Sequence, residues 1–413
     1  MGYSKQTFIG ISWMSAFRIF SRAIAFIRII ILARLLVPSQ FGIFAIASMA
    51  LALLEILTET GINVFLVQEK AEINEYVNDA WIVSIIRGIL ITLFIILTAP
   101  IVVAFFKIPQ ATGIIFLISI VPFIRGFINP AEVRFQKKLE FSKEFYFRSA
   151  IFGFDSLVAV LACLITRSAT GLVFGLLAGA ALEVILSFVL IKPVPSLKFN
   201  LQKITKIFHK GKWVTLYGFF NYAASEGDNV TIGKLLGPAS LGIYQMGYTI
   251  STLPVSEVSD VVNKVTFPVY AKMSEDKSRL RKGFRKTILL VSLISVFLGL
   301  IIYFFPKALF ILIFSQKWAE TINILKPLAV YGAIRGISGT TSSLLLAVGK
   351  QKYVAGMTFA RFIALIITII PLTVIYGLFG AAMSVLLSGV IELPLAIYYA
   401  NLIFRKESKK SDK

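Results

Sequence analysis

The 413-residue chain is poor in the residue types that most catalytic and metal sites require. It has one cysteine, Cys163, and one histidine, His209. A lone cysteine excludes an internal disulfide and a thiolate metal cluster, and a lone histidine excludes a cluster of imidazole ligands. No P-loop motif is present either, so we expect no ATP hydrolysis by this chain. We therefore expect no enzyme, no catalytic residue, no metal and no cofactor.

Charge is also scarce: only 15% of the residues are charged, whereas 57% are apolar. Soluble domains usually contain about 25% charged residues. Apolar runs of about twenty residues recur from end to end, which is typical of a polytopic membrane protein. The net charge of +21 is not gathered in a basic domain but lies in alternate gaps between the apolar runs. We therefore expect the lipid bilayer, and no nucleic acid, as a partner.

The apolar runs predict an all-α fold of about twelve transmembrane helices. The predicted spans are 8–32, 41–66, 80–105, 111–131, 146–166, 169–191, 213–236, 241–268, 286–305, 321–347, 352–375 and 378–403. One set of gaps is rich in lysine and arginine, and the other is short and nearly uncharged: VPSQ, FKIPQ, TRSATG, GPAS, FSQKW and YGLFG. By the positive-inside rule, both termini lie in the cytoplasm and the chain crosses the cytoplasmic (inner) membrane.

The chain repeats itself at an offset of 200 residues. RLLVPSQFGIF at 34–44 matches KLLGPASLGIY at 234–244, and Trp13 matches Trp213. Any tight turn between membrane helices favours proline and glycine, but the shared offset favours duplication. Six spans per half make the repeat parallel, as in transporters whose two halves rock around a central site.

The repeat predicts a six-helix lobe at 1–191, a basic linker at 192–212, a second six-helix lobe at 213–403 and a basic tail at 404–413. We expect the two bundles to form a V around a cationic cavity. The linker segment LKFNLQKITKIF alternates apolar and basic residues at helical spacing. It is equally compatible with a helix lying on the anionic inner leaflet and with a plain tether.

Ionisable residues inside the spans are costly and usually face a cavity or a partner. The first span carries Arg18, Arg22 and Arg28, and further arginines lie at Arg87, Arg125, Arg335 and Arg361. Guanidinium suits phosphate because its planar donors bind two oxygens at once. We predict that Arg18, Arg22, Arg28, Arg87 and Arg335 bind an anionic, phosphorylated headgroup.

The alternative is that these arginines form interhelical ion pairs. The available acids are Glu55, Glu59, Glu132, Asp155, Glu183, Glu226, Asp228, Glu257, Asp260 and Glu392. At the repeat offset Arg28 matches Asp228, so one position is basic in one half and acidic in the other. We assign Glu226, Asp228 and Asp155 to ion coupling or gating, with a proton or sodium as the ion.

The run SRAIAFIRIIILARLLVPSQFGIF at 21–44 and its sequel LLEILTETGINVFLVQEK at 53–70 resemble a known family. They are similar to the polysaccharide-transporter branch of the multidrug/oligosaccharidyl-lipid/polysaccharide (MOP) exporter superfamily, which includes Wzx-like O-antigen and exopolysaccharide flippases. The spacing of Ser21, Arg22, Arg28, Ala33 and Arg34 also resembles the first helix of lipid II flippases. Arginines of that helix bind the lipid pyrophosphate, which implies this role for Arg22 and Arg28.

Two departures separate the chain from its superfamily neighbours. Lipid II flippases typically have fourteen helices, and the multidrug exporters use a carboxylate in the first helix, which this first span lacks. The resemblance implies a flippase for polyprenyl-pyrophosphate-linked oligosaccharide in polysaccharide or lipopolysaccharide biosynthesis, with a polysaccharide polymerase or export machinery as a partner. The alternatives are a drug or cation antiporter of the same fold, a lipid II-type flippase and a membrane scaffold. The short outer gaps disfavour a glycan ligase or polymerase.

Overall fold

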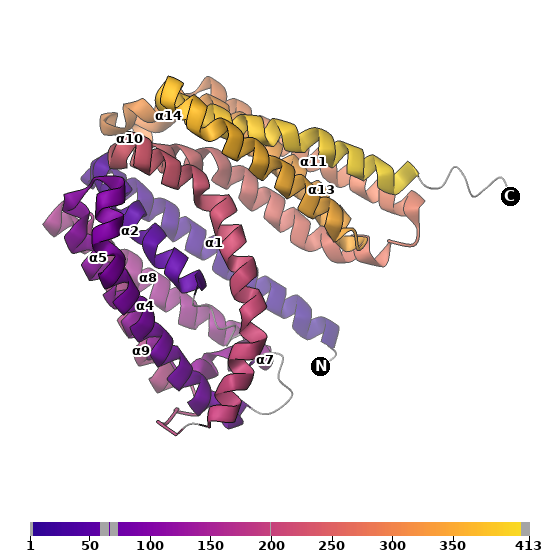
Figure 1. The fold of residues 1–413 in the computed structure, drawn as a ribbon. Coiled ribbons are helices and arrows are strands. Elements are labelled where there is room, and N and C mark those ends of the chain that lie inside the picture. Colours follow the sequence, from indigo (N-terminus) through magenta and orange to yellow (C-terminus); the bar gives the residue numbers. More distant parts are fainter. Residues whose placement is uncertain (1–2, 58–65, 67–72, 199, 406–413) are drawn as a thin grey trace. The chain divides into compact units, whose positions relative to one another are not determined.

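The structure, a computed structural model, describes residues 3–57, 66, 73–198 and 200–405. These residues form helices joined by short turns, with no strand among them (Figure 1). The described chain divides into two compact units, one of residues 1–226 with 237–239 and the other of residues 227–236 with 240–413. The lobe boundaries expected at 191 and 213 stay a prediction.

The first unit begins with a pair of long helices and continues with a series of helices and short 3-10 turns. The elements are α1 (Tyr3–Leu35), α2 (Pro38–Leu57), η1 (Ile73–Glu75), α4 (Val77–Phe106), η2 (Pro109–Ala111), α5 (Thr112–Ile118), α6 (Ile120–Gly126), η3 (Pro130–Val133), α7 (Arg134–Lys137), α8 (Phe141–Thr166) and α9 (Thr170–Leu190). The long helix α10 (Leu201–Lys272) begins in the first unit and continues into the second.

The second unit contains the rest of α10 and the helices that follow it. These are α11 (Lys277–Phe304), α12 (Pro306–Ile313), η4 (Gln316–Thr321), α13 (Ile322–Ala347) and α14 (Gln351–Arg405). A glycine in a conformation that other residues rarely adopt splits each of the two longest helices. Gly237 (φ 84°, ψ 178°) divides α10, and Gly377 (φ 58°, ψ −138°) divides α14.

The prediction of twelve helical spans is confirmed in the described residues. By length and composition, seven segments could cross a membrane: Pro38–Ile56, Val77–Phe106, Pro109–Gly126, Phe141–Thr166, Thr170–Leu190, Lys277–Phe304 and Gln351–Phe404. The last segment holds both parts of α14, and the other four predicted spans correspond to α1, the two parts of α10 and α13. The end of the predicted span 41–66 lies outside the described residues except for Leu66. The chain is a multi-pass membrane protein.

The predicted span 111–131 differs from the observed helices at its end. Helix α6 ends at Gly126, and Asn129 starts the 3-10 turn η3 by accepting a hydrogen bond from Ala131 N. The Asn129 amide also donates to Pro193 O at 3.0 Å, beyond the end of α9. A side chain that caps one turn and holds another segment stops the helix, because it satisfies backbone groups that the helix would otherwise use.

A row of glycines joins α9 to α8. Gly171, Gly175 and Gly179 are spaced by four residues, so they lie on one face of α9. A Cβ on Gly175 would lie 2.5 Å from Ala159 Cβ and 2.7 Å from Asp155 Oδ1. Small residues in such a row let two membrane helices approach closely. This close packing places Asp155 at the junction of α8 and α9.

Candidate functional site

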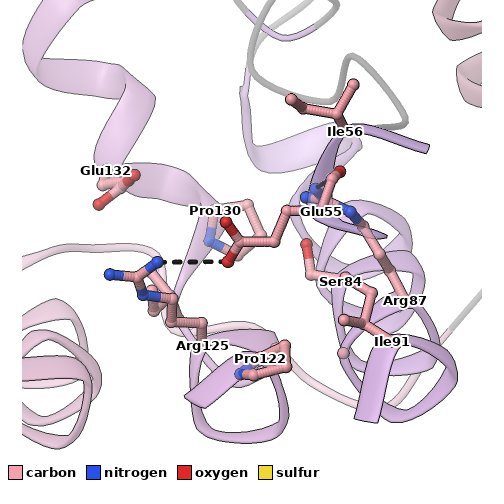
Figure 2. Close-up of a pocket in the computed structure, with 12 residues that line it drawn as sticks. Glu55, Ile56, Ser84, Arg87, Ile91, Pro122, Arg125, Pro130 and Glu132 are labelled. Carbon is pink, nitrogen blue, oxygen red and sulfur yellow. Dashed lines mark hydrogen bonds and ion pairs between the residues drawn. The ribbon is translucent and has the colours of Figure 1, made fainter. Parts of the chain in front are cut away.

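The first unit contains a cavity of about 360 Å³ between α2, α4, α6 and η3 (Figure 2). Polar and apolar side chains share its wall. The lining residues are Glu55, Ile56, Ser84, Arg87, Gly88, Ile91, Pro122, Arg125, Gly126, Ile128, Pro130 and Glu132. Its four charged residues are two arginines and two glutamates, one from each of the four elements. Ligand pockets typically measure about 300–1,000 Å³ and hold a few placed polar groups in an otherwise apolar wall.

Two close-packed glycines bring the arginines to one cavity. A Cβ on Gly88 of α4 would lie 2.5 Å from Pro122 O, and a Cβ on Gly126 of α6 would lie 3.0 Å from Ser84 O. Larger residues at either position would push α4 and α6 apart. Arg87 and Arg125, which directly precede these two glycines, therefore reach the same cavity from two helices.

Both arginines contact Glu55 near the C-terminal end of α2. Arg125 Nη1 lies 3.3 Å from Glu55 Oε1, as the dashed line in Figure 2 shows. Arg87 Nη2 donates to the Glu55 carbonyl oxygen at 2.7 Å. The last carbonyls of a helix have no partner within it and carry partial negative charge, so a guanidinium there is stabilised. These contacts hold the two guanidiniums at the cavity wall.

Arg28 of α1 is held by Asp155 of α8. Arg28 Nη1 lies 3.1 Å from Asp155 Oδ2, and the two side chains are only 16% and 13% exposed. Arg125 also acts on Asp155 electrostatically. Asp155, which we assigned to ion coupling or gating, is thus the acid that pairs with Arg28 in this structure.

The other two predicted arginines of α1 lie elsewhere on the helix. Arg22 is exposed and Arg18 is partly buried. Neither they nor Arg28 are among the residues that line the cavity described here. Of the five predicted binding residues, Arg87 alone lines the cavity.

Of the remaining predicted site residues, Asp228 and Arg335 belong to the second unit and Glu226 belongs to the first. Asp228 is buried and accepts a hydrogen bond from the Tyr244 hydroxyl at 2.7 Å, which joins the two parts of α10 across Gly237. Arg335 on α13 is exposed, and the acids Glu392 and Asp260 act on it electrostatically. Glu392 also pairs with Arg361 at 3.4 Å.

Sequence reasoning identified Arg125, Glu55 and Glu132 as charges in or near the spans but gave them no role in the binding site. A charged residue inside an apolar run is visible in the sequence. Its partner is not visible, because Arg125 and Glu55 are 70 residues apart and Arg28 and Asp155 are 127 apart. The Pro122 and Gly126 pair in α6 was the available signal, since such residues mark close helix packing.

Known proteins share this fold over almost the whole chain. The lipid II flippase MurJ in an inward closed conformation matches with a TM-score of 0.76 and 14% identity over 95% of this chain and 87% of that chain. An inward-facing multidrug resistance MATE family transporter of the MOP superfamily matches with a TM-score of 0.69 and 14% identity, over 95% and 96%. At this identity the likeness shows the fold alone, and it confirms the fold that the resemblance implied.

The chain is also similar in sequence to proteins of polysaccharide biosynthesis. The lipopolysaccharide biosynthesis protein WzxC of Escherichia coli (strain K12) is 24% identical over 402 residues, which cover 94% of this chain and 78% of the relative. The family described as "Polysaccharide biosynthesis protein" matches residues 31–323. The match includes most of the segment that carried the resemblance and extends far beyond it. Since it covers well over half of its length, the chain belongs to this polysaccharide biosynthesis protein family.

Proposed function

We propose that this chain flips a polyprenyl-pyrophosphate-linked oligosaccharide across the cytoplasmic membrane, with both termini in the cytoplasm. The family and the relative WzxC support the glycan, since both are named for polysaccharide or lipopolysaccharide biosynthesis. The lipid II flippase with the same fold supports transfer of a lipid-linked sugar. A polysaccharide polymerase or export machinery takes up the product. No covalent step is needed, because flipping changes the side of the membrane and not the substrate.

The observation that carries the proposal is the convergence of two guanidiniums on one cavity. Arg87 and Arg125 come from different helices and line the same space of about 360 Å³. Two guanidiniums offer enough donors to bind a diphosphate through paired hydrogen bonds. The apolar and small polar wall leaves room for the first sugar, while the polyprenyl chain stays in the bilayer.

The predicted residues outside the cavity have supporting roles in this proposal. Arg18, Arg22 and Arg28 of the first helix, and Arg335 of the second unit, bind the headgroup at other stages of the transport cycle. Asp155 holds Arg28 while no substrate is bound. Asp228 and Glu226 bind the coupling proton or sodium ion. Asp228 fits that role because it is buried and its hydrogen-bond donors are the Tyr244 hydroxyl and the backbone N–H of Asn229.

A second function, cation or drug antiport, is favoured by one observation. The buried Asp228 in a fold shared with a multidrug transporter is an acid of the kind that such exporters use. An antiporter would lower the cellular content of a cationic dye without any dependence on glycan synthesis. A flippase would restore surface glycan and leave the dye content unchanged.

The test is complementation of a host from which its own glycan flippase has been deleted. The wild-type chain is compared with Arg87→Gln, Arg125→Gln and a control, Lys138→Gln, all at equal membrane abundance. Lys138 is an exposed charge in the same unit, next to α7. We expect the wild type and the control to restore surface glycan, while the two arginine variants accumulate lipid-linked oligosaccharide. Full display by both arginine variants would contradict the role of the cavity.

A further inference from the structure

Three carboxylates and one guanidinium interact electrostatically beside the cavity, and Glu132 is one of the carboxylates. Glu132 lies on η3, Glu144 and Arg148 lie on α8, and Glu183 lies on α9. Glu132 interacts electrostatically with the other three. We call these four residues the carboxylate cluster. Its acids outnumber its base, so its formal charge is −2 when all three acids are ionised.

Within the carboxylate cluster, hydrogen bonds hold Glu144, while two carboxylate oxygens have no donor among the described residues. Glu144 Oε1 accepts from Gln136 Nε2 at 3.1 Å and from Arg148 Nε at 3.0 Å. Glu132 Oε2 and Glu144 Oε2 are both buried, and neither has a hydrogen-bond partner in the described part of the chain. The Glu144 side chain as a whole is only 3% exposed. A buried carboxylate oxygen without a donor is costly, and binding a proton removes that cost.

A proton fits this site better than a metal ion does. Among the described residues, no group of three or more acidic, cysteine or histidine side chains is arranged to hold a metal. A carboxylate needs only one bound proton to lose its charge, whereas a metal ion needs several ligands at once. The carboxylate cluster therefore points to proton binding at Glu132.

Glu132 connects the carboxylate cluster to the cavity, because it interacts with the other cluster residues and also lines the cavity, where Figure 2 shows it. With Glu132 ionised, the four charged residues of the cavity sum to a formal charge of zero: Arg87 and Arg125 against Glu55 and Glu132. With Glu132 protonated, the sum is +1. A net positive cavity attracts a phosphorylated headgroup more strongly than a neutral one.

We propose that Glu132 is a proton-binding site that sets the charge of the cavity and so couples proton uptake to binding of an anionic, diphosphate headgroup. The anionic ligand rests on the proposed function, whereas the proton site rests on the geometry of the carboxylate cluster. By linkage, a ligand that binds the protonated form more tightly must itself promote protonation to the same degree. Binding of the diphosphate is thus accompanied by proton uptake.

The surroundings of Glu132 favour a change of charge near neutral pH. Glu132 lies between the segments Pro109–Gly126 and Phe141–Thr166, outside both membrane spans. Burial raises its pKa to about 7, while Arg148 opposes the rise and Glu183 and Glu144 add to it. Arg125 of α6, Arg87 of α4 and Glu55 of α2 line the same cavity. A carboxyl group with such a pKa changes its charge near neutral pH, as a switch requires.

The test uses the full-length protein in lipid nanodiscs, and the probe is a polyprenyl-pyrophosphate-linked monosaccharide. Its diphosphate is a diester, so its charge does not change between about pH 6 and about pH 8. The affinity is measured at about pH 6 and about pH 8 for the wild type, Glu132→Gln and the control Glu140→Gln. Glu140 precedes the first residue of α8, one turn before Glu144, and pairs with the exposed Lys143 at 3.1 Å. We expect the wild type and Glu140→Gln to bind at least about fivefold more tightly at the lower pH. Glu132→Gln should bind with the same affinity at both.

The same samples give a second readout that does not depend on flipping. Infrared difference spectra of the wild type should show a protonated carboxyl that ionises near neutral pH and is absent from Glu132→Gln. Equal affinity of the wild type at the two pH values, or an unchanged carboxyl signal in Glu132→Gln, would overturn the proposal. If the pH-dependent binding is found but the protein flips no glycan, the proton site stands and the proposed function falls. If the protein flips glycan but its binding does not depend on pH, the proposed function stands and the proton site falls.

Discussion

The guanidiniums of Arg28, Arg87 and Arg125 each contact an oxygen of the first unit itself. A bound diphosphate must therefore displace this protein oxygen from the guanidinium or share the guanidinium with it. It can do so because it carries more negative charge than a carboxylate or a carbonyl and accepts two bonds from one guanidinium. The protein oxygens keep the arginines oriented while the site is empty and limit the strength of binding, which suits a substrate that must be released.

The pair of Arg28 and Asp155 yields a prediction that separates structure from binding. Arg28→Gln should lower the free energy of unfolding by on the order of 3 kcal/mol, because it leaves the largely buried Asp155 without its partner. The double variant Arg28→Gln/Asp155→Asn should recover most of this loss, as measured by thermal unfolding in nanodiscs. It should nevertheless export glycan poorly, since the guanidinium is missing. Normal export by the stable double variant would mean that Arg28 serves only to pair with Asp155.

The pKa of Glu132 predicts how stability depends on pH. Its folded-state value of about 7 lies above the ordinary value of 4.5, so the folded state binds the proton more tightly than the unfolded state. The contribution of Glu132 to stability is thus fully present below about pH 4.5 and is lost as the pH rises to about 7. The unfolding temperature of the wild type should fall relative to that of Glu132→Gln over this interval. A constant difference between the two proteins would contradict the raised pKa.

At the level of helices, glycines decide how closely neighbours approach and where a long helix turns. Their positions in the sequence predicted turns and span boundaries well: Gly237 and Gly377 fall between predicted spans and divide α10 and α14. The apolar run, by contrast, extended the fourth predicted span to residue 131, although α6 stops at Gly126. The sequence does not reveal that Asn129 bonds to a segment more than 60 residues away. The same Asn129 side chain caps η3, the turn that carries Glu132 to the cavity.

Packing of α9 on α8 should be sensitive to a single methyl group. Gly175→Ala should lower the unfolding temperature, because the new Cβ would lie 2.5 Å from Ala159 Cβ and 2.8 Å from Asp155 O. Gly153→Ala on α8 is the matched control, since a Cβ there meets nothing within 4 Å. Removing a glycine from an open helix position should be neutral or should stabilise by up to about 1 kcal/mol. Equal effects of the two substitutions would contradict the close contact.

The two copies of the internal repeat differ in backbone conformation at one position. Gly237 has a φ of 84° and a ψ of 178°, a region open almost only to glycine, whereas Val37 at the matching position is not among the residues of positive φ. Gly237→Val should therefore cost about 1–3 kcal/mol of strain. Val37→Gly, at a half-exposed position, should cost about 1 kcal/mol or less. Thermal unfolding of both variants tests this, and a neutral Gly237→Val would show that the two turns share one conformation.

At the level of the whole molecule, the all-helical fold and its twelve spans followed from hydropathy, because a bilayer admits few other structures. The binding residues were harder to predict from the sequence. An arginine in an apolar run, such as Arg87, is visible as a costly charge. Whether it faces a ligand or another side chain depends on helix packing, which brings together Glu55, Arg87 and Arg125 from three separate helices. Local patterns do not contain that information.

The most direct test of the flippase is transfer of its substrate in a reconstituted membrane. Purified protein is placed in liposomes whose inner and outer leaflets both contain polyprenyl-pyrophosphate-linked oligosaccharide. An enzyme added outside then modifies only the glycans it can reach. We predict that the wild type and Lys138→Gln expose the inner pool, whereas Arg87→Gln/Arg125→Gln leaves it protected as in protein-free liposomes. An inner pool that stays protected with the wild type, under imposed proton and sodium gradients of either direction, would contradict the central claim.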